Sequence, residues 1–559
     1  IYLDIFLRSF LASNQSGYEA LLAWKGNLFL RQQRQRAFAS GDPQAQKIQT
    51  RLQDTSRQLA RLYNTTPNPG EEKPYRDKLA ALAGEIEKAE QELAAVSAPF
   101  LRAQERARLK PEELAALLPA DTALVDLLEY GHYLPVEGGK GTWERRYLAW
   151  VLRPGKTVVQ VELGSAAEIN QLVSRWRAGL AKRLAPVEGD ADPALGLRDK
   201  VLGPLLPHLE GVKSLLVSPD SQLGTVPFAA LPGRDKGKYL IEEMEVAVVP
   251  FAQAIPDLVA PWKPAKTNNM LLALGDVSYG GDPGKSGVGA LDAPRGDKAA
   301  SWTPLPATKA EVEILAKRIG SLFPSAKAEL LEQDSATEGA LRTKAVSARW
   351  LHLATHGYFS PPEVKPLGLG NDARRGMFVS MEREKVSGTI PGLLSGIVLA
   401  GANQPPVIGK DDGILTASEV QDLDLTGVEQ AVLSACETGL GQSAGGEGLL
   451  GLQRGFQLAG CRTVVASLWK VPDHATMLLM RRYYENLWDR KMPKGQALRE
   501  AQIWILRECD DFRGKSTSRG IKPGVGSPPP KVSNNPPMAT TDRAPPVYWA
   551  AWVLSGGWR

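Results

Sequence analysis

A histidine and a cysteine that lie 80 residues apart are the side chains in this sequence best suited to act together in a reaction. His356 follows the apolar run 351–355 and precedes a glycine, and Cys436 follows the apolar run 432–435. Each run predicts a buried β-strand that ends in a reactive side chain and a turn. Because a parallel α/β sheet has its chemistry at the carboxyl ends of its strands, we expect His356 and Cys436 to lie side by side if these strands are neighbours.

Such a pair combines a nucleophile with its proton acceptor. A thiol is mostly protonated at neutral pH, and an imidazole can take its proton and later pass it to a leaving amine. The tetrahedral intermediate also needs donors for its oxyanion, and the backbone N–H groups of Gly357 and Cys436 are the natural candidates. The pattern therefore favours a cysteine hydrolase, and among these a peptidase.

Two further histidines are alternatives to His356. His352 lies four residues earlier on the same strand face, but it is inside the apolar run and no glycine follows it, so we expect a core or supporting residue. His474 follows Cys436 along the chain, which is the order found in class I glutamine amidotransferases. Those enzymes need a G-x-C-x-G turn, and here a serine and a threonine occupy the two glycine positions, which disfavours this pair.

The composition is that of an ordinary globular protein. The chain has 559 residues, of which 43% are apolar and 23% charged, and a net charge of +5, so two to four domains are expected. Basic and acidic residues are interleaved, which gives no reason to expect a nucleic-acid partner. No apolar run reaches the ~18 residues of a membrane span, so no membrane partner is expected either. The chain begins at Ile1 rather than at a methionine, which indicates a fragment.

The cysteine content points to a reducing compartment. Cys436, Cys461 and Cys509 are too few for a disulfide framework, so we expect a cytoplasmic protein. Cys461 and Cys509 are most simply buried apolar residues. The five histidines and three cysteines show no zinc-ligand spacing, so the sequence predicts neither a metal site nor a cofactor.

The chain divides into three regions with different patterns of apolar residues, and their elements must position His356 and Cys436. Residues 1–118 predict a helical segment, either the end of a helical repeat array or a helical hairpin, and residues 119–260 predict an α/β subdomain. Residues 266–559 alternate strands and helices, which predicts a mostly parallel sheet covered by helices on both sides. Within this region, about 512–546 is rich in Pro, Gly, Ser and Lys and predicts a flexible insertion, after which the apolar run 547–554 is expected to return to the sheet.

The elements follow from the spacing of apolar residues. The main predicted helices span 18–38, 45–62, 73–108, 166–184, 194–210, 307–319 and 474–488, and the predicted strands outside the two motifs span 123–128, 147–152, 158–161, 214–219, 245–250, 270–275, 463–469 and 547–554.

Residues from about 300 to 559 resemble the CHAT family of caspase-like cysteine peptidases, which are relatives of caspases and separases. The segments that carry the resemblance are 352–357, 412–419, 433–439, 446–448, 459–462, 467–473 and 548–551. The resemblance implies a caspase-like fold, His356 and Cys436 as the catalytic dyad, and the Gly357 and Cys436 amides as oxyanion donors. Residues 119–260 resemble a degenerate caspase-like half, and the family often carries helical repeats upstream, which suits residues 1–118.

The same resemblance suggests a substrate preference. In separase-like relatives, an acidic residue after the strand that follows the cysteine reads a basic P1 side chain, and Asp473 occupies the matching position. A carboxylate there would pair with arginine or lysine. The alternative is that Asp473 only caps the helix that begins near His474.

These observations together predict a cysteine endopeptidase that cuts after a basic residue. Its substrate would be a protein or peptide, and its resting form is expected to be latent until a protein partner activates it through the N-terminal helical segment. The first alternative is a catalytically silent scaffold or interaction module with the same fold. A third hypothesis is acyl transfer or amide hydrolysis on a small molecule, which would still need Cys436.

Overall fold

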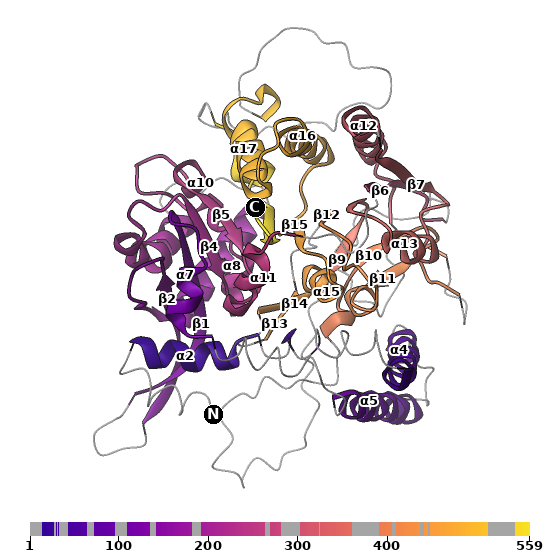
Figure 1. Ribbon diagram of the computed structural model, residues 1–559, viewed down its shortest axis with the longest axis horizontal. Helices are drawn as coiled ribbons and strands as arrows, with labels where there is room; N and C mark the ends of the chain where they lie inside the picture. The colour runs from indigo at the N-terminus through magenta and orange to yellow at the C-terminus, as the bar shows by residue number, and fades with distance from the viewer. Residues whose placement is uncertain are drawn as a thin grey trace.

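The chain forms a mixed α/β fold around one 11-stranded sheet (Figure 1). The computed structural model describes residues 14–26, 29–30, 32, 43–63, 72–94, 109–134, 141–181, 192–262, 269–280, 302–323, 325–359, 391–404, 410–435, 441–444, 448–512 and 543–559. Seven of the ten strand pairings in this sheet are parallel, which confirms the predicted class of a mostly parallel sheet flanked by helices.

The sheet runs in the order β3-β2-β1-β4-β5-β16-β15-β12-β8-β6-β7. Its strands are β1 (Thr122–Leu134), β2 (Thr142–Leu152), β3 (Val159–Ser165), β4 (Ser214–Ser218), β5 (Glu245–Val248), β6 (Met270–Val277), β7 (Lys327–Gln333), β8 (Trp350–Ala354), β12 (Gln430–Ser434), β15 (Thr463–Ser467) and β16 (Trp552–Gly556). A three-stranded sheet contains β9 (Gly357–Phe359), β10 (Ser395–Val398) and β11 (Ile414–Thr416). A two-stranded sheet contains β13 (Gly441–Ala444) and β14 (Gly448–Gly451).

Helices cover both faces of the sheet. The α-helices of the described residues are α2 (Asn14–Trp24), α4 (Pro43–Tyr63), α5 (Glu72–Ala94), α7 (Pro111–Ala116), α8 (Ala166–Ala181), α9 (Pro193–Leu197), α10 (Leu240–Glu243), α11 (Ile255–Val259), α12 (Ala307–Leu322), α13 (Glu338–Ala345), α14 (Ala417–Val420), α15 (Leu452–Leu458), α16 (Asp473–Tyr484) and α17 (Lys494–Arg507). In the C-terminal half, α12, α16 and α17 pack on one face, and α13, α14 and α15 pack on the other (Figure 1). Because β8, β12 and β15 are covered on both faces, every one of their residues is buried, which explains their continuous apolar runs.

The two α/β regions share this one sheet, and they run in opposite directions within it. β1, β4 and β5 are parallel to one another, and so are β15, β12, β8, β6 and β7. β16 joins the two sets, because it is parallel to β5 and antiparallel to β15. Because the two sets run in opposite directions, their carboxyl ends point to opposite sides of the molecule along the strand direction.

The last strand differs in position from its prediction. The expected return to the sheet is confirmed, but the strand begins at Trp552, and Pro546–Tyr548 forms a 3₁₀ turn instead. The reason is the packing of Trp549, which is fully buried with its ring 5.2 Å from that of Tyr239 and its indole N–H donating to the Ala544 carbonyl at 3.1 Å. An extended strand through this point would not allow that contact.

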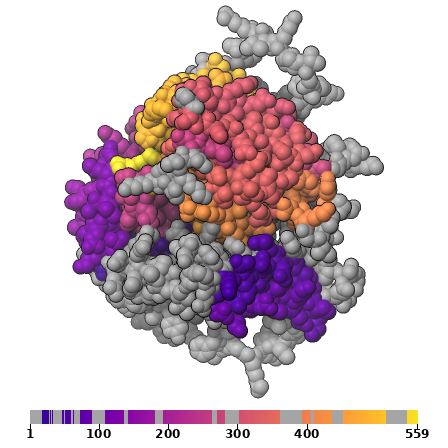
Figure 2. Space-filling model, turned by 45° about the vertical axis from the view of Figure 1, so that its right-hand side comes forward, coloured from indigo at the N-terminus to yellow at the C-terminus, as the bar shows by residue number. Residues whose placement is uncertain are grey.

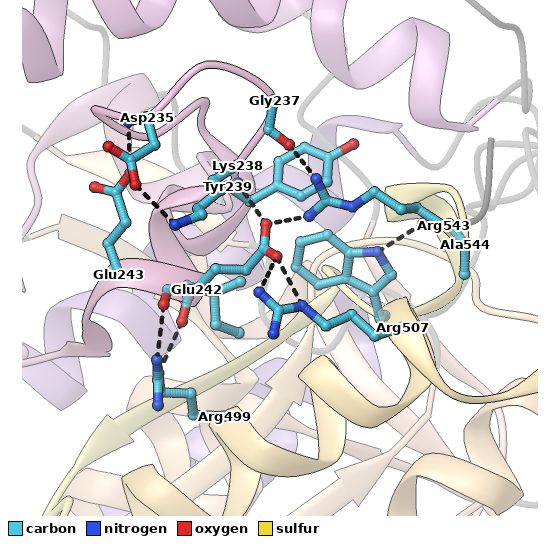
Figure 3. A network of polar contacts seen from close by, with 12 residues as sticks. Asp235, Gly237, Lys238, Tyr239, Glu242, Glu243, Arg499, Arg507, Arg543 and Ala544 are labelled. Carbon is cyan, nitrogen blue, oxygen red and sulfur yellow. Dashed lines mark hydrogen bonds and ion pairs between the residues drawn. The ribbon is translucent and has the colours of Figure 1, made fainter.

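A buried carboxylate fixes the segment that leads into this strand (Figure 3). Glu242 accepts hydrogen bonds from the Tyr239 N–H at 2.8 Å, from Arg507 at 2.9 Å and from Arg543. Burial alone would raise the pKa of Glu242, but the Tyr239 N–H and the two guanidinium groups lower it below its usual range. The carboxylate therefore ties Arg543, and with it the segment that leads into β16, to α10.

The N-terminal helical residues divide into two parts. The predicted helix 45–62 is confirmed as α4, which pairs with α5 in a lobe at the lower edge of the molecule (Figure 2). α2 instead packs on the α/β body through Lys25, which is only 1% exposed and lies 2.5 Å from the Asp126 carboxylate. The Lys25 ammonium also donates to the Leu127 carbonyl at 2.7 Å and to both oxygens of Ser218 at 2.9 Å. Residues 14–26 are thus an integral part of the α/β body.

Candidate active site

The strands that precede the two predicted catalytic residues are neighbours. β8 and β12 pair in parallel with Ala354 opposite Ser434. His356 lies two residues beyond Ala354, and Cys436 comes two residues beyond Ser434 in the sequence. The predicted pairing of the two motif strands is therefore confirmed. Cys436 itself lies outside the described residues, so its place beside His356 stays a prediction.

His356 is held in one orientation by its surroundings. It is 5% exposed, and its Nε2 lies 2.7 Å from the backbone carbonyl oxygen of Thr303. Since a carbonyl can only accept, Nε2 carries the proton and Nδ1 keeps its lone pair in the neutral ring. The rings of Trp302 and Tyr279 lie 5.3 and 5.2 Å from the imidazole and fix it from the sides. This arrangement leaves Nδ1 as the basic atom.

The electrostatic environment keeps this imidazole neutral. Burial lowers the pKa of His356, and the positive charge of Lys470 lowers it further, while the hydrogen bond to Thr303 opposes the shift. A histidine with a lowered pKa is already in its basic form at neutral pH. The side chain is thus prepared to accept a proton.

The backbone after His356 presents a hydrogen-bond donor. The Val398 N–H donates to the His356 carbonyl at 2.8 Å, and Gly357 is opposite Ile397 in the next pair of the β9–β10 ladder. Bonded and non-bonded pairs alternate in an antiparallel ladder, so the Gly357 N–H points away from β10. This orientation suits the predicted role of an oxyanion donor.

His352 is a supporting residue, as expected. It is fully buried, its Nε2 lies 2.8 Å from the Glu311 carboxylate, and its Nδ1 lies 3.2 Å from the Tyr484 hydroxyl. Ser434 on the neighbouring strand donates to the same Glu311 oxygen at 2.7 Å. The sequence analysis missed Glu311, because one glutamate on an amphipathic helix is ordinarily a solvated charge.

Asp473 is the first residue of α16, directly after β15 and its connecting turn. The prediction that it caps the helix is wrong, because Pro472 occupies the N-cap position with an extended backbone. Burial raises the pKa of Asp473, the negative charge of Glu311 adds to this, and Lys470 opposes it.

The alternative histidine has a different environment. His474 is 58% exposed, and its Nε2 lies 3.0 Å from the Asp511 carboxylate. Both members of this pair are exposed, whereas His356 is buried and held by the Thr303 carbonyl, which favours His356 as the base.

The remaining cysteines are structural. Cys461 and Cys509 are buried free thiols, as predicted, and burial raises the pKa of Cys461 to about 12. Among the described residues, no group of three or more His, Cys, Asp or Glu side chains could hold a metal ion. None of the described helices is both long and apolar enough to cross a membrane.

Comparison with known proteins places this site in a family. The family model described as the CHAT domain matches residues 192–557. The chain belongs to the CHAT domain family. The predicted resemblance is thereby confirmed, and the match includes both predicted catalytic residues and Asp473.

Curated relatives of this CHAT protein are much longer than the chain. Tetratricopeptide repeat protein 28 of Mus musculus is 25% identical over 313 residues, and its Homo sapiens counterpart is 24% identical over 313 residues. In both cases the alignment covers 53% of this chain but only 12% of the relative.

Solved structures with similarity to the CHAT protein include a separase–securin complex and a cysteine proteinase. The Saccharomyces cerevisiae separase–securin complex matches with a TM-score of 0.38 and 10% identity, over 84% of this chain and 36% of that chain. The Arg-specific cysteine proteinase gingipain R matches with a TM-score of 0.35 and 9% identity, over 70% of this chain and 74% of that chain.

Proposed function

We propose that this chain is a cysteine endopeptidase in which His356 activates Cys436. The observation that carries the proposal is the orientation of His356. Its Nε2–H donates to the Thr303 carbonyl, so Nδ1 is the free base. His356 lies just beyond β8, and β8 pairs with β12, the strand that leads to Cys436. Membership of the CHAT family supports the same reading.

Each step of peptide hydrolysis has a group in this arrangement. Nδ1 of His356 takes the thiol proton, and the Cys436 thiolate attacks the peptide carbonyl carbon. The Gly357 N–H, with the Cys436 N–H, stabilises the negative oxygen of the tetrahedral intermediate. The protonated imidazole then gives its proton to the leaving amine, and a water molecule, deprotonated by the same imidazole, hydrolyses the thioester.

A cut-site map tests this proposal directly. The purified chain is incubated with a diverse peptide mixture, with the Cys436→Ala variant in parallel, and products are identified by mass spectrometry. Cuts made only by the wild type are expected. If both proteins leave every peptide intact, with or without a partner of the N-terminal helical segment, the peptidase proposal fails.

We further propose that Asp473 selects a basic side chain before the scissile bond. The Asp473→Asn variant is expected to lower kcat/KM for substrates with arginine at P1 by roughly 10- to 100-fold, because a charge-assisted hydrogen bond is lost. Substrates with a neutral P1 residue should change little. Asp511→Asn, which removes an exposed carboxylate on the neighbouring segment, is the control. Equal losses for arginine and neutral substrates would contradict a specificity role.

A non-enzymatic scaffold is the second candidate. The curated relatives are named as tetratricopeptide repeat proteins, and helical repeats commonly bind other proteins. In this alternative the fold serves to display a binding surface, and a partner binds the N-terminal helical segment. The same segment would hold the activating partner of a latent, cytoplasmic peptidase, so the cut-site map with and without partner separates the two candidates.

A further inference from the structure

The strands that lead to the dyad are joined beneath the site by one buried carboxylate. Glu311 is 3% exposed and comes from α12. One of its oxygens lies 2.8 Å from His352 Nε2 on β8 and 2.7 Å from Ser434 Oγ on β12. The two contacted residues precede His356 by four positions and Cys436 by two. The carboxylate therefore fixes β8 and β12 relative to each other close to their carboxyl ends.

All of these contacts are compatible with an ionised Glu311. His352 donates from Nε2 and Ser434 donates from its hydroxyl, while the Tyr484 hydroxyl can donate to the remaining ring nitrogen, Nδ1, at 3.2 Å. A buried charge is tolerated where such donors surround it. The network therefore supplies the Glu311 carboxylate with one donor from each of the two strands.

The segment that leads into the same helix supplies the group that orients His356. The Thr303 carbonyl that accepts from His356 lies eight residues before Glu311, in the segment that enters α12. Close packing fixes this entry, because the Thr308 carbonyl lies within 2.9 Å of where a Cβ at Gly275 would be. Any shift of α12 against β8 and β12 would thus also move the acceptor of the His356 proton.

We propose that Glu311 is a positioning residue that joins the two dyad strands and thereby sets the geometry of the dyad. The inference has two parts, the link between the strands and its effect on the rate, and the second part rests on the proposed function. Two substitutions test them. Glu311→Gln keeps a hydrogen-bond acceptor for His352 and Ser434. Glu311→Ala removes it.

The positioning part is tested by hydrogen exchange followed by mass spectrometry. In Glu311→Ala, amides of 350–356 and 430–435 are expected to exchange faster than in the wild type, and those of Glu311→Gln should stay closer to the wild type. Glu313→Gln, which alters a second glutamate of the same helix, is the matched control. If Glu311→Ala does not fold, Ser434→Ala replaces it, with faster exchange expected in 430–435. Unchanged exchange would overturn the positioning role.

The rate part is tested by kcat/KM on one peptide substrate. Glu311→Ala should lose at least about 10-fold in kcat/KM, because the dyad geometry is relaxed, and Glu311→Gln, which keeps the acceptor, should lose less. No loss in Glu311→Ala, or equal losses in the two variants, would contradict this part.

The two experiments distinguish failure of this inference from failure of the proposed function. Hydrogen exchange needs no catalysis, so it tests the positioning role even in a chain that cuts nothing. A wild type that cuts no peptide while Glu311→Ala shows faster exchange would contradict the peptidase proposal, and with it the effect of Glu311 on the rate. The structural link between the strands would still stand. A wild type that cuts, with all Glu311 variants indistinguishable from it, would overturn the inference alone.

Discussion

Replacing His356 with alanine is expected to lower kcat/KM for peptide substrates by about 10²- to 10⁴-fold, the usual contribution of a general base. The reason is that the variant lacks the group whose Nδ1 is free while Nε2–H is bound to Thr303. The rate of Cys436 alkylation by iodoacetamide at neutral pH should fall in parallel, because fewer thiolates form without the imidazole. Both rates can be measured on the same preparations.

The pH dependence of the wild type follows from the same geometry. The pKa of His356 is lowered by burial and by Lys470, so the neutral base persists below the ordinary histidine pKa of about 6.5. The acid limb of kcat/KM should therefore lie below about pH 6.5. An acid limb well above this value would contradict a buried, neutral His356 as the base.

His474→Ala is the matched control for this prediction. Its imidazole is exposed and bound to Asp511, so cleavage should persist after its removal. If His474→Ala abolished cleavage and His356→Ala did not, the dyad would be Cys436 with His474, and the assignment made above would be wrong.

Replacing Lys25 with methionine is expected to destabilise the chain by about 3–5 kcal/mol, because it leaves a buried carboxylate without its counter-charge. Lys25 and Asp126 are each about 1% exposed, and the ammonium also satisfies two backbone carbonyls and the Ser218 hydroxyl. Denaturant unfolding followed by circular dichroism measures the loss. The double variant Lys25→Met with Asp126→Asn should recover part of it, since no unpaired charge is then buried.

An exposed ion pair supplies the control for the Lys25 variant. Lys73 and Asp77 form an i,i+4 pair on α5 with side chains 82% and 64% exposed. Such pairs contribute little to the free energy of unfolding, so Lys73→Met should unfold close to the wild type. If Lys25→Met behaved like Lys73→Met, residues 14–26 would not be an integral part of the α/β body.

Local sequence patterns predicted the two strands that precede His356 and Cys436 well. The runs before His356 and Cys436 are continuous and apolar because both faces of β8 and β12 are covered. β8 ends at Ala354, two residues before His356, and Gly357 begins β9. These signals lie within a few residues of each other, so they can be read without the fold. The same holds for α4 and α12, whose apolar residues follow the helical period.

The partners of these residues could not be predicted, because they are distant in sequence or belong to the backbone. The Thr303 carbonyl that orients His356 is a backbone atom, which any residue would provide. Glu311 and Lys25 look like surface charges on amphipathic helices until the contacts to His352 and Asp126 are known. The two half-sheets are joined where Ser555 of β16 pairs with Val248 of β5, which lies about 300 residues earlier in the chain. No local sequence pattern predicts a pairing over that distance.

The place of β16 between β5 and β15 has a consequence for synthesis in the cell. β16 is the last of the sheet strands to leave the ribosome, yet it is the strand that closes the gap between the two halves. Until it emerges, β5 and β15 are open edges with unpaired backbone groups, which can pair with other chains. Nascent chains of this protein should therefore depend on chaperones most strongly just before the final strand appears, and a premature stop upstream of Trp552 should yield aggregates of both halves rather than one folded half.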